Sequence, residues 1–289
     1  MWQNIEFLIG GLLLLAAAAR LLVPKVRGKE TNAKEADELN RPAFGFAQTR
    51  GSREVQADFG DAVQTKAGVL ALLADGMGKS NTGKLCAQVA ADTVLDAYMS
   101  YEVLPNPDYF FRISLREANL RIQKLIGERR AGAGLAAAFL SEGLLHYCVA
   151  GDVRLALFRN KELIPLSEGQ TVDVLAVKAF EKGKMSRKEA IWCMDEKRQW
   201  NYLGMDGFHE IEFPLAPIRL KPGDRIIMAT KGIWQELPWG AQEDIFCEQR
   251  TLQETAARLI SSAEANPGED KENGTVLVLG AETAGKSGE

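Results

Sequence analysis

The sequence predicts an α+β protein in which helices and antiparallel strands form separate layers. Two long helix-like segments follow one another directly, and three short strand-like segments come straight after them. Strands and helices therefore occur in groups, and they do not alternate as they do in a parallel doubly wound sheet. The chain has 289 residues, of which 46% are hydrophobic and 26% charged, which suits one large or two small globular domains.

The amino-terminal segment is the most apolar part of the chain. Residues 5–23 span 19 positions with almost no charge, which is long enough for a helix to cross a bilayer. Four basic residues lie between Arg20 and Lys29, whereas no Lys or Arg precedes the apolar segment. The positive-inside rule then places the body of the protein in the cytoplasm, behind a single-pass anchor in the cell membrane at residues 1–27. A cleaved signal peptide is the alternative, but the basic leading region that it needs is missing.

Composition sets the other boundaries of the domain. Residues 28–42 are polar with mixed charge, as in a solvated linker, and residues 281–289 are small and polar, as in a frayed tail. The folded domain is therefore expected at residues 43–280.

The predicted elements follow from hydrophobic spacing along this domain. Apolar residues recur with helical period over residues 87–98 and again over residues 111–125. Hairpin-like breaks at 141–143 and 151–152 separate the three strand-like segments after them, which predicts an antiparallel meander. The remaining expected elements, in chain order, are a first buried strand at 69–74, the three strands at 134–140, 144–150 and 154–159, a strand at 226–230, an amphipathic helix at 252–263 and a last strand at 275–279.

Charge and cysteine content exclude two classes of function. The formal net charge is -4 and no dense basic stripe interrupts the sequence, so nucleic-acid binding is not expected. The four cysteines lack CxxC spacing, so they predict neither a zinc site nor a disulfide framework. A reducing compartment fits them best.

Two predicted strands end in a charged residue followed by glycine, and the two charges are opposite. The first strand leads into Asp75-Gly76, and the strand at 226–230 leads into Lys231-Gly232. A strand-terminal acid followed by glycine suits metal chemistry, because the carboxylate and a turn carbonyl can ligate one hard cation. A lysine in the second position changes what such a site can do.

The glycines after Asp75 also invite comparison with a nucleotide phosphate loop. Gly78, Gly83 and Lys84 match the start of that motif between a strand and a helix, but Leu85 stands where a hydroxyl would hold magnesium. A tight strand-to-helix turn is the alternative, although it leaves Asp75 unexplained.

Six short motifs, in their order along the chain, resemble those of one enzyme family. They are Gly51–Asp58, Ala74–Gly78, Gly132–Leu135, Val149–Arg154, Lys221–Arg225 and Glu272–Val276. Together they are similar to the motifs of the PPM class of metal-dependent protein phosphatases, also called type 2C serine/threonine phosphatases. The resemblance implies a four-layer αββα sandwich, in which two stacked antiparallel sheets are flanked by helices.

The same resemblance implies a reaction and a set of metal ligands. The family hydrolyses phosphoserine and phosphothreonine in proteins with a water that bridges two Mg2+ or Mn2+ ions, because two cations lower the pKa of that water and stabilise the phosphoryl group. Asp75 would bridge both ions, and the Gly76 carbonyl would assist the first. Glu272 would serve the second ion in place of the usual aspartate, and Asp152 would contribute to a third, weaker site.

Arg53 and Asp58 complete the catalytic residues that the resemblance implies. In the family's opening motif an arginine binds the substrate phosphate and an acid follows a few residues later. Arg53 and Asp58 occupy these two positions, so Asp75, Arg53 and Asp58 are the expected catalytic residues.

Lys231 stands where the family has an aspartate that ligates the second ion. An ammonium group has no lone pair and cannot ligate a metal. We therefore expect a degraded metal site that holds one divalent ion or none, with the Lys231 ammonium paired with Asp75, Glu272 or Asp152. Two further positions depart from the family in the same direction, because Ala57 replaces a glutamate and Ser80 replaces a histidine found in many bacterial members.

An alternative is that Lys231 points to solvent and that a displaced acid, Asp195 or Asp206, completes the site. The segment Thr171–Leu203 resembles the variable flap that covers the family's active site. Its Lys and Arg side chains suit either contact with a phosphorylated partner or a solvated charged surface.

Two functions follow from these expectations. The first is a membrane-anchored protein phosphatase whose two-metal catalysis is impaired by Lys231. The second is a pseudophosphatase that binds a phosphorylated or unmodified protein partner as a regulatory or scaffold module.

Overall fold

The structure, a computed structural model, describes residues 44–281. The predicted anchor at 5–23, the linker at 28–42 and all but the first residue of the tail at 281–289 lie outside these described residues. Within residues 44–281, no helix is both long and apolar enough to span a bilayer.

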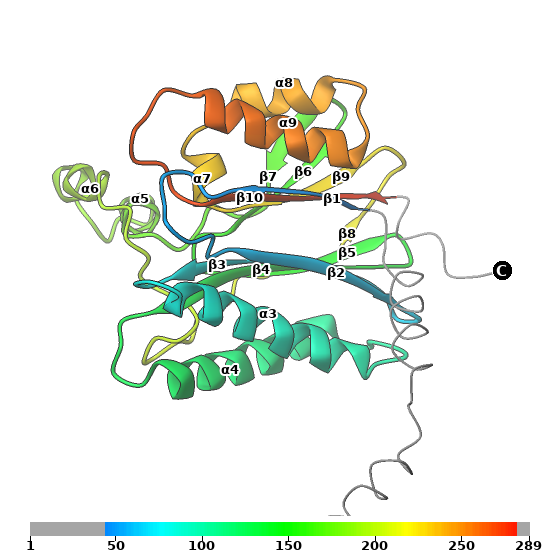
Figure 1. The fold of residues 1–289 in the computed structure, drawn as a ribbon, viewed down its shortest axis with the longest axis horizontal. Helices are drawn as coiled ribbons and strands as arrows, with labels where there is room; N and C mark the ends of the chain where they lie inside the picture. Colours follow the sequence, from blue (N-terminus) through cyan, green and yellow to red (C-terminus); the bar gives the residue numbers. More distant parts are fainter. Residues whose placement is uncertain (1–43, 282–289) are drawn as a thin grey trace, which may run out of the picture. The chain divides into compact units, whose positions relative to one another are not determined.

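Two five-stranded antiparallel sheets form the centre of the fold and stack on one another (Figure 1). The first sheet has the order β1 (Phe44–Thr49), β10 (Gly274–Gly280), β9 (Arg225–Ala229), β6 (Arg154–Arg159), β7 (Glu162–Pro165). The second has the order β2 (Phe59–Thr65), β3 (Gly68–Met77), β4 (Gly132–Ser141), β5 (Leu144–Ala150), β8 (Ile218–Arg219). The predicted pair of antiparallel sheets is confirmed.

Helices cover the outer face of each sheet, so the fold has four layers (Figure 1). The second sheet is covered by α3 (Thr82–Met99) and α4 (Pro107–Ile126), and the first by α8 (Trp239–Cys247) and α9 (Leu252–Ala265). A short helix, α7 (Lys231–Trp234), begins directly after β9. The remaining helices, α5 (Val172–Glu181) and α6 (Arg187–Cys193), project to one side (Figure 1).

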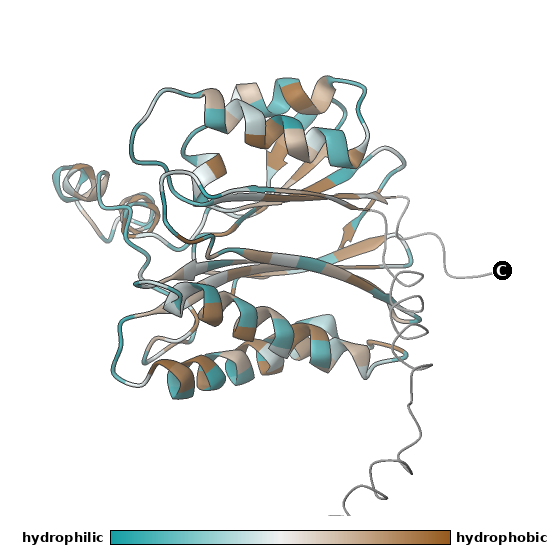
Figure 2. Cartoon of the chain, viewed as in Figure 1, coloured by the Kyte–Doolittle hydropathy of each residue, from teal (hydrophilic) through white to brown (hydrophobic). Residues whose placement is uncertain are grey.

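The apolar side chains form three buried clusters that correspond to the spaces between the layers. One lies between the two sheets, a second lies under α3 and α4, and a third lies under α8 and α9. Figure 2 shows hydrophobic and hydrophilic residues interspersed along the four covering helices, as expected for helices with one buried face. Capping residues mark where two of these helices begin. Asn106 caps α4 before Pro107, and Thr251 forms a capping box with Glu254 at the start of α9.

The predicted meander of three strands is wrong at its second turn. β4 and β5 pair as expected, but β6 pairs with β9 and β7 in the other sheet. Gly151 has φ 87° and turns the chain from one sheet to the other, and the next residue is Asp152. Buried strands on either side of a glycine look alike whether they form a hairpin or cross between sheets, so the sequence pattern did not distinguish them. The crossover delivers Asp152 to the edge where the two sheets meet.

Candidate active site

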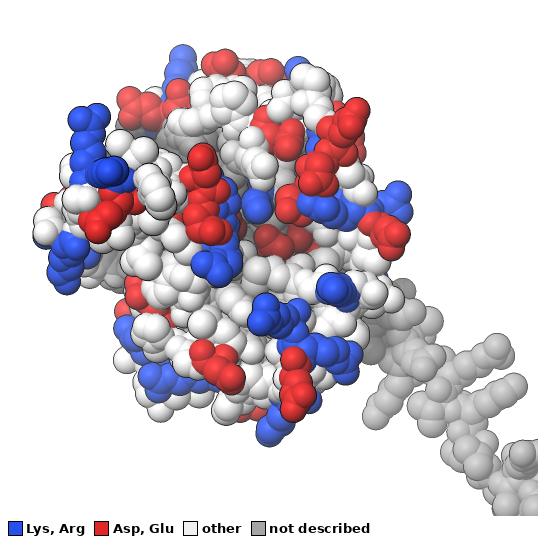
Figure 3. All heavy atoms as spheres, turned by 90° about the vertical axis from the view of Figure 1, so that its left-hand side faces the viewer, with Lys and Arg blue, Asp and Glu red and all other residues white. Residues whose placement is uncertain are grey.

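A pocket of about 570 Å³ opens at this edge, beside the ends of β3 and β9. Figure 3 shows it as a hollow with acidic side chains at its floor and both charge types around its rim. Four parts of the chain line it: the loop before β2, the end of β3 with the turn after it, the segment that returns from α6, and the start of α7 together with the residues just before β10. The lining residues are Arg53, Glu54, Val55, Ala57, Asp75, Gly76, Met77, Gly78, Ser80, Lys197, Arg198, Gln199, Lys231, Glu272 and Asn273.

The end of β3 presents Asp75 and Gly76 to this pocket. Asp75 pairs with Gly134 of β4, so the strand ladder fixes its position. A Cβ atom on Gly76 would lie 2.3 Å from the carbonyl oxygen of Gly83 and 2.6 Å from that of Ala57. Only glycine fits there, because two other segments of backbone approach so closely.

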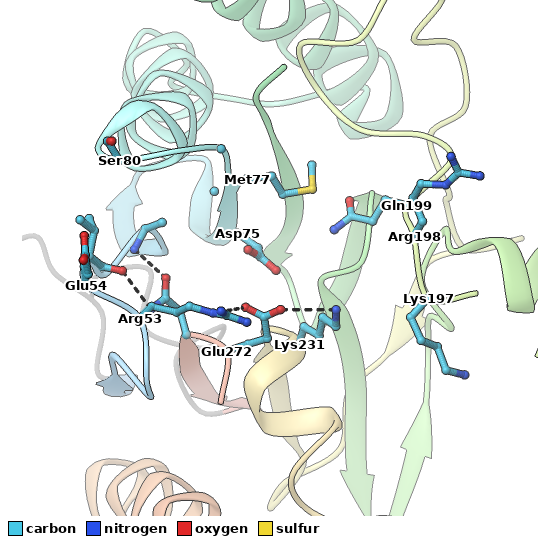
Figure 4. A pocket seen from close by; sticks show the side chains of 15 residues that line it. Arg53, Glu54, Asp75, Met77, Ser80, Lys197, Arg198, Gln199, Lys231 and Glu272 are labelled. Carbon is cyan, nitrogen blue, oxygen red and sulfur yellow. Dashed lines mark hydrogen bonds and ion pairs between the residues drawn. The ribbon is translucent and has the colours of Figure 1, made fainter. Parts of the chain in front are cut away.

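Lys231 and Arg53 both bind Glu272 (Figure 4). The Lys231 Nζ lies 3.7 Å from one carboxylate oxygen, Oε1, of Glu272. The Arg53 Nε donates a hydrogen bond of 2.8 Å to the other oxygen, Oε2, and its Nη1 lies 3.0 Å from Asp270 Oδ1. Both oxygens of Glu272 therefore face cationic side chains of the chain itself.

Excess negative charge surrounds Asp75. Burial raises the pKa of the Asp75 carboxyl well above its usual value, and the nearby carboxylates of Asp58, Asp152 and Glu272 raise it further. The Lys231 ammonium acts in the opposite direction and lowers this pKa. The lysine thus offsets part of the repulsion among acids that converge at the two strand ends.

Asp152 lies behind the pocket and does not line it. Its side chain is buried next to Arg154, whose Nε is 3.6 Å from Asp152 Oδ1. Burial raises the pKa of Asp152, while Arg154 and Lys231 oppose that rise. A Cβ atom on Gly169 would lie 2.3 Å from Asp152 Oδ1, so the chain before α5 closes over this carboxylate.

Asp58 is also buried below the pocket. The hydroxyl groups of Thr230 and Thr275 donate hydrogen bonds of 2.9 and 2.7 Å to its Oδ2. Burial raises the pKa of Asp58 to about 6, against the lowering effect of these hydrogen bonds. In this geometry Asp58 joins the loop before β2 to the ends of β9 and β10, which carry Lys231 and Glu272.

The residues at the pocket do not fit a pair of divalent ions. Within residues 44–281, no group of three or more His, Cys, Asp or Glu side chains is arranged to hold a metal. Glu272 is bound by two cations, and the ammonium of Lys231 has no lone pair to donate. The other oxygen donors that line the pocket include Asp75, the backbone of Gly76 and the exposed carboxylate of Glu54.

The two displaced acids considered as alternatives lie elsewhere. Neither Asp195 nor Asp206 is among the residues that line the pocket. Asp206 accepts a hydrogen bond of 3.3 Å from the side chain of Gln123 on α4. Lys231 does line the pocket, and its side chain is about one-third exposed.

Asn273 is the most important residue whose role the sequence did not indicate. Its amide nitrogen donates to the carbonyls of Arg50 and Val55 at 2.9 and 3.1 Å, and its oxygen accepts from the Ala57 backbone at 2.9 Å. These bonds hold the loop that carries Arg53. Asn273 follows Glu272 within a recognised motif, so its position was visible although its role was not.

The flap-like segment contributes three further residues, Lys197, Arg198 and Gln199, which line the pocket where the chain returns from α6. Lys197 is held by Asp173 of α5, at 2.6 Å between Nζ and Oδ2. The expectation that the segment Thr171–Leu203 borders the site agrees with this placement.

Known proteins with the same arrangement of layers are serine/threonine phosphatases. The solved structure of the S. agalactiae serine/threonine phosphatase has a TM-score of 0.72 and 20% sequence identity, over 82% of this chain and 98% of that one. The catalytic domain of the protein phosphatase PstP, solved in complex with two manganese ions, has a TM-score of 0.64 and 22% identity, over 82% of this chain and 96% of that one.

This protein has the PPM phosphatase fold. Its sequence also resembles this family, because the serine/threonine phosphatase stp of Listeria welshimeri is 25% identical over 217 residues, which are 73% of this chain and 83% of that protein. The corresponding phosphatase of Listeria monocytogenes gives the same values. No family model matches the chain. The matched segment thus covers most of the described residues.

Proposed function

We propose that this protein binds phosphoserine or phosphothreonine proteins at the pocket, and that two-metal hydrolysis is impaired by Lys231. The observation that carries the proposal is the Lys231 ammonium, 3.7 Å from Glu272, at the strand end opposite Asp75. The positive charge of Lys231 repels a second divalent ion, and the ion pair with Lys231 occupies the Glu272 carboxylate. Two-metal hydrolysis depends on ions that lower the pKa of the attacking water, so their loss removes most of the rate.

Phosphate binding does not need those ions. Arg53 and Lys231 line the pocket beside Glu272, and Lys197 and Arg198 line its edge where the chain returns from α6 (Figure 4). Arginine suits a phosphoryl group because its planar guanidinium can donate two parallel hydrogen bonds. A phosphorylated side chain can thus be held between cations without being hydrolysed.

The test compares the full-length protein with its Lys231→Asp variant. Turnover of a generic aryl phosphate and of a phosphothreonine peptide is measured with Mn2+. We expect the wild type to stay near the background rate and the variant to exceed it by on the order of 10²-fold, because a carboxylate restores a ligand for the second ion. A Lys221→Asp variant makes the same charge change away from the pocket and should match the wild type. A wild-type rate equal to that of Lys231→Asp contradicts the proposal.

A second candidate is a low-activity phosphatase, favoured by Asp75 and the Gly76 turn, which keep the shape of a single metal position. Calorimetric titration with Mn2+ separates the two. One bound ion together with measurable wild-type turnover, abolished by Asp75→Asn, would favour the phosphatase. Phosphopeptide binding without turnover would favour the pseudophosphatase.

We also propose that residues 5–23 anchor the protein in the cell membrane, with the domain in the cytoplasm. The length of the apolar segment and the basic residues after it support this orientation. After cell fractionation, the full chain should resist extraction from membranes by alkaline carbonate, and a variant that lacks residues 5–23 should not. A protease that cannot cross the membrane should cut the domain only in lysed cells. Release of the full chain by carbonate would contradict the anchor.

A further inference from the structure

We infer that four basic side chains beside the pocket, Lys79, Lys84, Arg129 and Arg130, bind an acidic segment of the partner protein, next to its phosphorylated residue. We call these four residues the basic corner. The inference rests on the proposed function, because it assumes that the phosphorylated residue occupies the pocket.

The fold brings the basic corner together from two chain segments. Met77 of β3 lies opposite Gly132 of β4, so the residues just beyond these strand ends are neighbours. A Cβ atom on Gly78 would lie only 2.9 Å from the Cβ of Ala131. Lys79 directly follows Gly78, which lines the pocket, and Arg130 directly precedes Ala131, so the backbones of Lys79 and Arg130 lie close to this contact.

Lys84 and Arg129 extend the corner along the start of α3. Lys84 lies in the first turn of this helix. Burial raises the pKa of the Cys86 thiol, two residues further on, to about 11, and the charge of Arg129 opposes this rise. Arg129 is therefore close to the first turns of α3, and the four charges share one end of the α3 and α4 layer.

The four side chains are exposed, and within the described residues none of them forms an ion pair or a side-chain hydrogen bond. The cations around the rest of the pocket are paired instead. Arg53 binds Asp270 and Glu272, and Lys197 binds Asp173. Figure 3 shows Lys and Arg side chains on the surface below the hollow, in the half of the molecule that α3 and α4 form.

Four exposed basic side chains without acidic partners among the described residues favour an acidic ligand. Glu128 is the one acid between Lys124 and Ala131, so the corner keeps an excess of positive charge. Charges that lie within the screening length, which is about 8 Å at physiological salt, act together on a ligand. An extended peptide advances about 3.3 Å per residue, so acids about two to five residues from the phosphorylated side chain can reach the corner. The geometry favours a peptide over a lipid surface, because the corner adjoins the pocket.

The experiment uses the full-length protein in mild detergent and four peptides that share one phosphorylation site. Two contain the phosphothreonine, flanked by either four glutamates or four glutamines, and two are the same peptides without phosphate. Affinities are measured by fluorescence anisotropy at low and high salt. The test variant is Lys84→Glu/Arg130→Glu. The matched control is Lys221→Glu/Arg258→Glu, which reverses two exposed charges away from the pocket.

We expect the wild type to bind the acidic phosphopeptide about tenfold more tightly than the glutamine phosphopeptide at low salt, since several individually weak, exposed ion pairs would form together. This preference should fall at high salt, disappear in the test variant and persist in the control. A second variant, Lys79→Gln/Arg129→Gln, should reduce it without charge reversal. Urea unfolding midpoints equal to that of the wild type would show that each variant is folded.

The other possible outcomes show whether the basic corner or the proposed function of the pocket is wrong. Equal binding of the two phosphopeptides, with none of the unphosphorylated ones, overturns the basic corner and leaves the proposed function intact. Binding that follows the glutamates and ignores the phosphate supports the corner and overturns the pocket's function. If the test variant loses binding to vesicles that contain phosphatidylserine but keeps the peptide preference, the corner binds lipid and the inference is wrong.

Discussion

The ends of β3 and β9 share a backbone design but carry opposite charges. Near the end of each strand, a charged residue is followed by a glycine that another segment approaches closely. A Cβ on Gly76 would lie 2.3 Å from the oxygen of Gly83, and a Cβ on Gly232 would lie 2.3 Å from the oxygen of Asn273. The side chains before these glycines are Asp75 and Lys231. The comparison teaches that one backbone arrangement can present opposite charges at two neighbouring strand ends.

The largest expected effect comes from breaking the shared scaffold itself. Gly76→Ala and Gly232→Ala each force a Cβ against backbone, which cannot move aside as a flexible side chain does. Each should lower the free energy of unfolding by about 3 kcal/mol or more, measured by urea denaturation. Gly240→Ala in α8, where a Cβ would meet nothing within 4 Å, is the matched control and should be neutral or slightly stabilising. Unequal losses at Gly76 and Gly232 would show that the two turns are less alike than their geometry indicates.

The next effect concerns Asp58, which lies beneath both strand ends. Its pKa is raised to about 6 in the folded protein. The protonated Asp58 carboxyl stabilises the folded protein fully below the unfolded-state pKa of about 4. This contribution to the free energy of unfolding is lost as the pH rises through about 6, because the folded protein then releases the proton from Asp58. The difference in free energy of unfolding between Asp58→Asn and the wild type should therefore favour the variant more at pH 7 than at pH 4, by about 1 to 3 kcal/mol. Urea titrations at both pH values measure this, and a pH-independent difference between wild type and variant would contradict it.

A third measurement separates the charge of Lys231 from its shape. Lys231→Met removes the ammonium but adds no ligand. We expect it to tighten Mn2+ binding by about tenfold in calorimetry, because a nearby positive charge no longer opposes the ion. Lys197→Met is the matched control, since Lys197 also lines the pocket but is neutralised by Asp173. Equal effects of the two variants would mean that Lys231 has no special relation to the ion.

The smallest expected effect is at Asp270, which competes with phosphate for Arg53. The pair is exposed, with the Asp270 side chain 82% accessible, so it contributes little. Asp270→Asn should improve phosphopeptide affinity by no more than about fivefold. The matched control is Glu269→Gln, which removes a neighbouring charge that makes no side-chain contact with Arg53 within residues 44–281. Weaker phosphopeptide binding in Asp270→Asn would indicate that Asp270 positions Arg53 for binding.

Local sequence patterns predicted the layers and the positions of several elements, although β3 continues to Met77, three residues beyond its expected end. Alternation, helical spacing and glycine turns act over a few residues, so β3, β5, β9 and the helix pair could be located from the sequence. The meander failed because the choice between a hairpin and a crossover at Gly151 depends on which sheet has space for β6. That choice is a property of the packed molecule.

The site itself was predictable as a set of residues but not as a set of contacts. The family resemblance pointed to Asp75, Glu272 and Lys231, and the structure brings them to one pocket. It did not indicate that Arg53 binds Glu272, because that contact joins residues 219 positions apart. Asn273 was missed for the same reason, since its role is to tie down a loop at the other end of the chain.

The crossover at Gly151 has a mechanical consequence for this site. Asp75 belongs to one sheet, whereas Lys231 and Glu272 extend from the other. The distances between Asp75 and these two side chains therefore depend on how the two sheets are offset against each other. Side chains such as Leu73 and Met228, packed between the sheets, determine that offset although neither of them lines the pocket. The spacing of the charged residues at the pocket consequently depends on apolar side chains throughout the layer between the two sheets.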